Sequence, residues 1–125
     1  IKVNIIGSIP HSEVLKTLEN YHFFLMPTQH ENFGHIFLEA LSAGCPLIIS
    51  DRTPWLNLEK EKAGWSIPLE KPTEWKKVIQ KCVDMDQQKY NELSENSRLF
   101  VGKWLRENDL AKETLSLFEV ALSNA

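Results

Sequence analysis

The stretch FFLMPTQHENFGHIFLEALSAGCPLIIS, residues 23–50, carries the clearest secondary-structure signals of this chain. It opens with a short apolar run that stops at Pro27 and closes with a second apolar run over residues 46–50. Short apolar runs next to proline and glycine predict buried strands. Between them, residues 34–43 carry apolar side chains at helical spacing, and Gly44 is a typical residue after a helix end. The stretch therefore predicts a strand, a helix and another strand.

The same alternation continues on both sides. Upstream, residues 3–6 form a β-branched run that predicts a first strand, and residues 12–20 predict a helix with an apolar stripe. Downstream, residues 56–62 predict a short helical or irregular piece, and residues 63–67 predict a short strand. Beyond residue 73 only helical spacing remains, and we expect helices there over residues 73–83, 87–105 and 109–123.

Strands that alternate with helices indicate an α/β fold. Right-handed crossovers would give a Rossmann-like parallel sheet of about four strands flanked by helices on both faces. In such sheets a ligand binds beyond the carboxyl ends of the strands. Residues 27–31 and 50–54 follow two predicted strands, so they mark the expected edge for a site.

Composition excludes several classes of function. The chain has 125 residues, 42% hydrophobic and 25% charged, as expected for one globular domain. A formal charge of −3 with scattered lysines argues against nucleic acid as a partner. The two cysteines, Cys45 and Cys82, show neither disulfide nor zinc spacing, and we expect no metal. No apolar run approaches the roughly 18 residues of a membrane span.

Two acids give the strongest functional signal. Glu31 and Glu39 lie eight positions apart, the first in a predicted loop and the second inside the following helix. A helix start offers unpaired N–H groups and partial positive charge to a phosphate, and Gly34 removes the steric obstruction there. Carboxylates on both sides would accept hydroxyl groups, which predicts a sugar nucleotide. The alternative is that Glu31 only favours the helix dipole while Glu39 faces solvent.

The ordered pattern from Phe24 to Asp51 resembles the nucleotide-sugar site of GT-B glycosyltransferases, especially the retaining family 4, or group 1, enzymes. The matching features are a strand ending in Pro-Thr, an acid, Phe-Gly, a second acid eight residues on, Glu-Ala, and Gly-x-Pro before a strand. The resemblance extends to residues 7–10 and 64–65. The helices after residue 85 match only in general character.

This resemblance implies a role for each matching residue. Glu31 would be the catalytic carboxylate, which contacts the donor hexose near the reacting carbon. Glu39 would accept hydrogen bonds from the ribose hydroxyls of the donor. Backbone amides would hold the hexose and diphosphate, at Phe33, Gly34, His35 and Ile36. In the loop before the first helix, Gly7 and Ile9 would line the nucleotide base. Thr28 would order the loop after the second strand, with a capping or turn role as the alternative.

The same resemblance predicts the reaction. A hexose would pass from a nucleotide diphosphate sugar to a glycan or lipid-linked acceptor, with retention, as in polysaccharide biosynthesis. The nucleotide sugar is the substrate, and we expect no cofactor. Residues 1–125 would be part of the C-terminal, donor-binding domain, without its first part and without the N-terminal domain. Because cations for the diphosphate come from that missing part, we expect little turnover from this piece alone. We expect a cytoplasmic location, with peripheral attachment at the inner membrane face as the family-level variant.

Two alternatives stay open. Another GT-B enzyme, such as a glycogen-synthase-like polymerase or a sugar-nucleotide epimerase, would carry a similar site. A non-catalytic α/β binding module would use the acids and the helix start only to stabilise its structure. The run Asp84-Met85-Asp86 imitates a DxD metal motif, but it follows a predicted helix, and we expect both acids to stand at helix ends. Trp55 is expected in the core or an interface, with an acceptor contact as the alternative.

Overall fold

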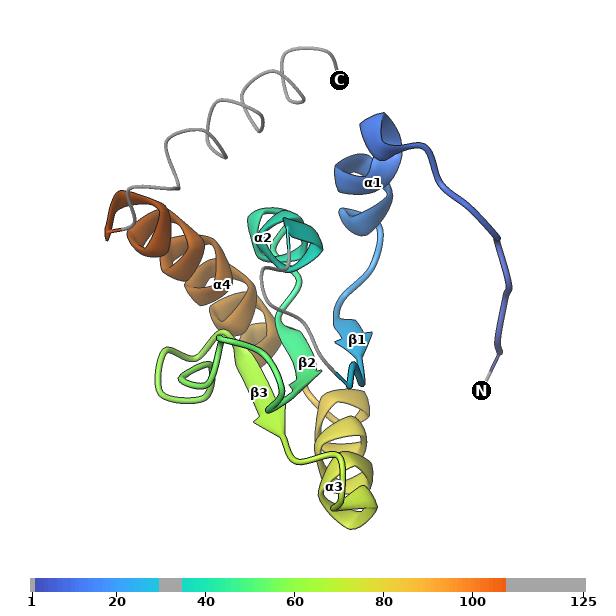
Figure 1. The fold of residues 1–125 in the computed structure, drawn as a ribbon, viewed down its shortest axis with the longest axis vertical. Helices are drawn as coiled ribbons and strands as arrows, with labels where there is room; N and C mark the ends of the chain where they lie inside the picture. Colours follow the sequence, from blue (N-terminus) through green and yellow to red (C-terminus); the bar gives the residue numbers. More distant parts are fainter. Residues whose placement is uncertain (1, 30–34, 108–125) are drawn as a thin grey trace.

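The computed structural model describes residues 2–29 and 35–107 (Figure 1). Helices and strands alternate up to the second strand, a segment of turns and bends leads to the third strand, and two helices follow it. In chain order the elements are α1 (His11–Leu18), β1 (Phe24–Met26), α2 (His35–Ser42), β2 (Leu47–Ser50), β3 (Gly64–Ile67), α3 (Pro72–Val83) and α4 (Gln87–Glu107). The predicted α/β class and the strand–helix–strand unit at its centre are therefore confirmed.

The sheet is parallel, with strand order β1-β2-β3. Met26 pairs with Ile49, and Ile49 pairs with Ser66, so β2 has a neighbour on each side. All four residues of β2 are buried. The parallel sheet agrees with the prediction, but three strands are present among the described residues where about four were expected.

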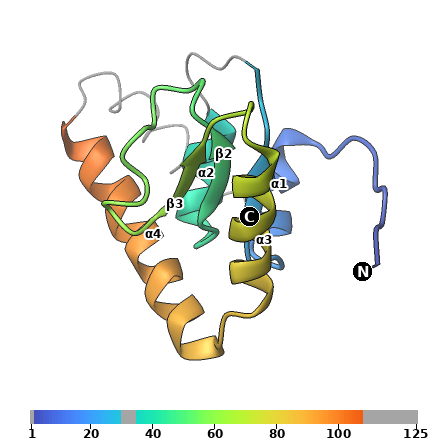
Figure 2. The same cartoon turned by 90° about the horizontal axis from the view of Figure 1, so that it is seen from below.

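Alternate side chains of β2 enter two separate apolar clusters. Leu47 and Ile49 belong to the larger cluster, which includes side chains of α2 and α4. Ile48 belongs to the smaller cluster, together with side chains of β3 and α3. Figures 1 and 2 show α2 and α3 on opposite sides of the strands. Helices thus cover both faces, and each fully buried aliphatic side chain stabilises the fold by about 1.5–3 kcal/mol.

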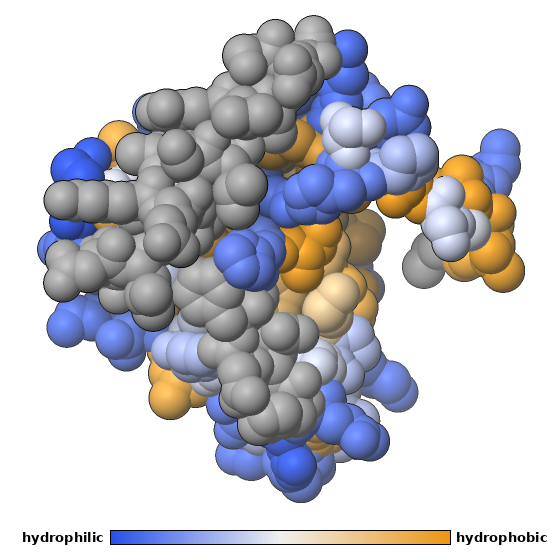
Figure 3. Space-filling model, turned by 45° about the horizontal axis from the view of Figure 1, so that its top comes forward, coloured by the Kyte–Doolittle hydropathy of each residue, from blue (hydrophilic) through white to orange (hydrophobic). Residues whose placement is uncertain are grey.

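The prediction of a strand over residues 3–6 is wrong. This segment pairs with none of the strands that the structure describes, and Val3, Ile5 and Ile6 are 79%, 94% and 64% exposed. In the space-filling view the N-terminal segment stands away from the body of the molecule (Figure 3). An extended run becomes a strand only when a neighbour accepts its backbone hydrogen bonds, and no described strand lies beside it.

The helices differ from the predictions mainly at their ends. Helix α1 starts one residue earlier than expected and stops at Leu18. Residues 56–62 are irregular, with turns over 58–62, which is the second of the two forms expected there. Tyr90, near the start of α4, donates its hydroxyl to the carbonyl oxygens of His22 and Gly44. This places the start of α4 at the amino ends of β1 and β2. The predicted helix over residues 109–123 lies outside the described residues. In the described part of the chain, no helix has both the length and the hydropathy of a transmembrane span.

Candidate functional site

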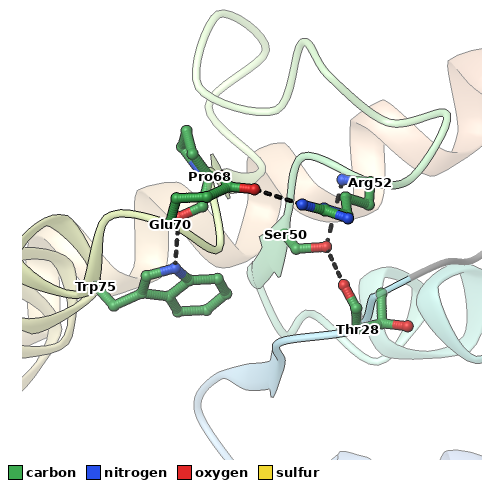
Figure 4. A network of polar contacts seen from close by, with 6 residues as sticks. All are labelled: Thr28, Ser50, Arg52, Pro68, Glu70 and Trp75. Atoms are coloured by element: carbon green, nitrogen blue, oxygen red, sulfur yellow. Dashed lines mark hydrogen bonds and ion pairs between the residues drawn. The ribbon is translucent and has the colours of Figure 1, made fainter.

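The carboxyl ends of all three strands are joined by a polar network (Figure 4). Ser50 ends β2, and its hydroxyl donates to the Thr28 carbonyl oxygen beyond β1. The backbone N–H of Arg52 donates to the same Ser50 oxygen at 3.3 Å. The Arg52 guanidinium forms an ion pair with Glu70, which follows β3. The edge at which the sequence predicts a ligand is therefore polar and internally connected.

Helix α2 carries the second predicted acid into the protein. Phe37, Leu38 and Leu41 are fully buried against the sheet, and they fix the rotation of the helix. That rotation brings Glu39 inside as well, with only 8% of the residue exposed. The alternative in which Glu39 merely faces solvent is therefore wrong.

Burial changes the acid–base behaviour of Glu39. Loss of solvent around the carboxylate is the largest effect and raises the pKa of Glu39 above its ordinary value. His11 and His35 act in the opposite direction, because their positive charge favours the ionised carboxylate and lowers its pKa. His35 stands one helical turn before Glu39 on α2, whereas His11 belongs to α1. A carboxylate from one helix and imidazoles from two are thus electrostatically coupled.

The Glu39 carboxylate receives no hydrogen bond from any residue that the structure describes. In the same part of the chain, no side-chain nitrogen or oxygen is both fully buried and without a partner. The Glu39 oxygens therefore remain reachable by solvent although the rest of the side chain is covered. A buried carboxylate of this kind gains free energy when a ligand hydroxyl donates to it.

The predicted site residues fall into three groups. Thr28, His35, Ile36 and Glu39 follow β1 or form the first turns of α2, and Ile36 packs against the larger cluster. Gly7 and Ile9 lie in the segment before α1; Gly7 has a φ of 72° and open space where a β-carbon would stand. Their roles stay predictions. Glu31, Phe33 and Gly34 lie outside the described residues.

The two acids of the DxD-like run Asp84-Met85-Asp86 lie at helix ends. Asp84 follows α3 and accepts hydrogen bonds from the Gln80 side chain at 3.0 Å. Asp86 precedes α4 and accepts the Lys89 N–H at 2.8 Å. Within residues 2–29 and 35–107, no group of three or more His, Cys, Asp or Glu side chains is placed to hold a metal ion. The helix-end interpretation of these acids is confirmed.

Trp55 belongs to the core. It is 5% exposed and packs against the rings of Phe37, Phe100 and Trp104. The residue thus joins the loop after β2 to α2 and α4, as expected for a core tryptophan.

Three residues at the site were not singled out by the sequence. Ser50 and Arg52 fall in the strand-end segment that was predicted to matter, but their individual contacts were not foreseen. A serine at the end of an otherwise aliphatic strand is the signal that could have found the first of them. His11 interacts with Glu39 because α1 packs on α2, and no local sequence pattern predicts that contact.

Comparison with known proteins identifies the family. The sequence model of the family described as "Glycosyl transferases group 1" matches residues 1–100, which is 100 of the 125 residues. The chain belongs to the group 1 glycosyltransferases. This family membership supports glycosyl transfer, which requires a sugar donor and an acceptor. The search of curated proteins and the search of solved structures returned no match.

Proposed function

We propose that this chain supplies the donor side of a retaining glycosyltransferase and binds a nucleotide diphosphate hexose at the carboxyl edge of its sheet. The acceptor would be a glycan or a lipid-linked sugar held by a further domain. The observation that carries the proposal is the Glu39 carboxylate, which is buried, reachable by solvent and without a hydrogen-bonding partner among the described residues.

In this proposal Glu39 accepts hydrogen bonds from the two ribose hydroxyls. A carboxylate has two oxygens and can take both protons of a vicinal diol as charge-assisted hydrogen bonds. The two bonds offset the desolvation that raises the pKa of Glu39 in the free protein. His11 and His35 would help to keep the carboxylate ionised and therefore able to accept both protons.

The other predicted site residues would either stabilise negative charge or position the substrate. The start of α2 would stabilise the negative charge that grows on the leaving diphosphate, through the amides of Phe33, Gly34, His35 and Ile36. Glu31 would contact the hexose near the reacting carbon, and Gly7 and Ile9 would contact the base. Thr28 would order the chain between β1 and this site. These residues require no cofactor for the proposed chemistry.

Calorimetric titration with UDP, GDP and ADP tests the proposal. We expect at least one of the three to bind, and Glu39→Ala should weaken that binding by about 1–3 kcal/mol, because a charged acceptor is lost. Glu13→Ala removes an exposed acid from α1 and is the matched control for the change in net charge. Equal weakening in both variants would show that Glu39 acts through charge alone.

Absence of binding for all three nucleotides would instead favour a non-catalytic α/β module. If binding is found, the reaction class is decided with a longer protein that contains this chain, by determining the products and their anomeric configuration. Transfer with retention supports the proposal, whereas epimerisation of the sugar nucleotide or elongation of a glucan would support the other GT-B activities. We expect the 125 residues alone to give little turnover.

A further inference from the structure

The β1–β2 ladder stops at the edge where the donor is proposed to bind. Met26 and Ile49 are the last paired residues of these two strands. The next residue of β1 is Pro27, which has no N–H group and cannot continue a backbone ladder. The chain beyond β1 therefore needs another attachment if its course is to be fixed relative to β2.

Ser50 provides this attachment through its side chain. The hydroxyl donates to the carbonyl oxygen of Thr28, so a side-chain bond continues the link between the strands beyond Pro27. The same oxygen accepts the N–H of Arg52 at 3.3 Å, which holds the turn after β2. One hydroxyl thus ties together the chain segments that leave both strands (Figure 4).

Packing alone does not explain a serine at this position. Ser50 is fully buried, and the three residues before it in β2 are Leu47, Ile48 and Ile49. An aliphatic side chain would gain burial energy in such surroundings, whereas a hydroxyl is unfavourable unless it is hydrogen-bonded. The residue type is therefore accounted for by the bonds that it makes to Thr28 and Arg52.

We propose that Ser50 is a positioning residue of the donor site. It would hold Thr28, and with it residues 27–29 that follow β1, at the edge of the sheet where the diphosphate and hexose are proposed to bind. This inference rests on the proposed function, because it is the donor site that gives the tether its purpose. Ser50 itself would touch no part of the substrate.

The test compares three variants of the chain. Ser50→Ala removes the tether, and Ser50→Cys keeps a donor at the same position, although the S–H group is larger and donates more weakly. A thiol can make such a bond in this protein, since Cys45 donates to the carbonyl oxygens of Leu18 and Tyr21 at 3.2 Å. Ser66→Ala is the matched control, because its hydroxyl contacts the Ser50 carbonyl oxygen at 3.4 Å from the neighbouring strand.

Calorimetry gives the first measurement, with the nucleotide diphosphate that the parent chain binds best and the corresponding monophosphate. We expect Ser50→Ala to weaken diphosphate binding about fivefold, the ordinary effect of one lost hydrogen bond, with a smaller effect on the monophosphate. Ser50→Cys should lose about twofold. Ser66→Ala should leave the ratio of the two affinities unchanged. A change in the ratio of diphosphate affinity to monophosphate affinity indicates positioning, because a general loss of stability would weaken both affinities alike.

Hydrogen exchange gives a second measurement that needs no nucleotide. Amides of residues 24–29 should exchange faster in Ser50→Ala, while those of α4 keep their parent rates. If hydrogen exchange becomes faster in Ser50→Ala but the parent chain binds no nucleotide, both the proposed function and the positioning role are overturned. The hydrogen bond between Ser50 and Thr28 would still be supported by the exchange data. If nucleotide binds and the affinity ratio of Ser50→Ala is unchanged, only the positioning role is overturned. Should Ser50→Ala not fold, the same comparison is made with Ser50→Cys.

Discussion

Residues 3–6 and β2 have nearly the same composition, but only β2 forms part of the sheet. The first run is Val-Asn-Ile-Ile and the second is Leu-Ile-Ile-Ser. Strand β2 is buried, pairs with β1 and β3, and has helices over both faces. The run near the N-terminus is exposed, and no strand in the described part of the chain pairs with it. An apolar, β-branched run therefore permits a strand, but a strand forms only where neighbouring strands pair with it.

The largest expected effect comes from placing one methyl group in each region. A β-carbon at Gly64 would lie 2.0 Å from the Leu47 carbonyl oxygen, and Gly64 has a φ of 145° that other residues rarely adopt. We expect Gly64→Ala to lower the free energy of unfolding by at least about 3 kcal/mol, because β3 cannot then approach β2. Urea unfolding measures the loss.

Gly7→Ala is the counterpart in the exposed segment. Gly7 also has positive φ, but nothing lies within 4 Å of the position of a β-carbon. Because an exposed segment can relax, we expect a change below about 1 kcal/mol. Equal losses at Gly7 and Gly64 would contradict the contrast between the two regions.

A second pair of substitutions shortens the same side chain in both regions. Ile49→Ala opens a cavity at a fully buried position of β2 and should lower the free energy of unfolding by about 2–5 kcal/mol. Ile5→Ala changes a side chain that is 94% exposed and should stay within about 0.5 kcal/mol of the parent. A loss of more than about 1 kcal/mol at Ile5 would mean that this segment packs against the protein in solution.

A smaller effect with the opposite sign is expected at Glu39. Burial raises its pKa in the folded chain, so the folded state binds this proton more tightly than the unfolded state. The ionised carboxylate therefore lowers stability at neutral pH. Stability recovers as the pH falls through the raised pKa toward the ordinary value of 4.5. Glu39→Gln should accordingly be more stable than the parent at pH 7.5, with a smaller advantage at pH 5.

Unfolding in urea at both pH values measures this difference. The exposed variant Glu13→Gln is the control and should stay within about 0.5 kcal/mol of the parent at either pH. A Glu39→Gln chain that is less stable than the parent at pH 7.5 would show that the carboxylate stabilises the fold. Together with weaker nucleotide binding, a gain in stability would place Glu39 among residues kept for function rather than for folding.

The smallest effect concerns thiol reactivity and involves no change in stability. Burial raises the pKa of both Cys45 and Cys82 to about 11, so neither is appreciably ionised at pH 8. Cys45 is fully buried, whereas Cys82 is half-buried. We expect iodoacetamide to modify Cys82 first in the folded chain, and both at similar rates in urea. Mass spectrometry of the two peptides measures the order, and faster modification of Cys45 would mean that the core around α2 opens readily.

Much of the central fold was predictable because local sequence patterns specify it. The strand–helix–strand unit of residues 23–50 was expected within about one residue at its boundaries, since Pro27, Gly44 and Pro46 punctuate it. The run 3–6 was not predictable in the same way. Its residues satisfy the same local rule, but the outcome depends on whether a strand lies beside it, and no local pattern carries that information.

The same distinction between local patterns and long-range contacts applies to the candidate site. Local patterns alone were enough to show which residues could accept hydroxyl groups, and that Glu39 stands on a helix following a strand. The folded chain was needed to show that Glu39 is buried and coupled to His11, and that Ser50 reaches Thr28 across 22 positions of the chain. This is so because periodicity and turn chemistry act between near neighbours in sequence. Burial, electrostatic coupling and the tether between strand ends arise between groups that only folding brings together.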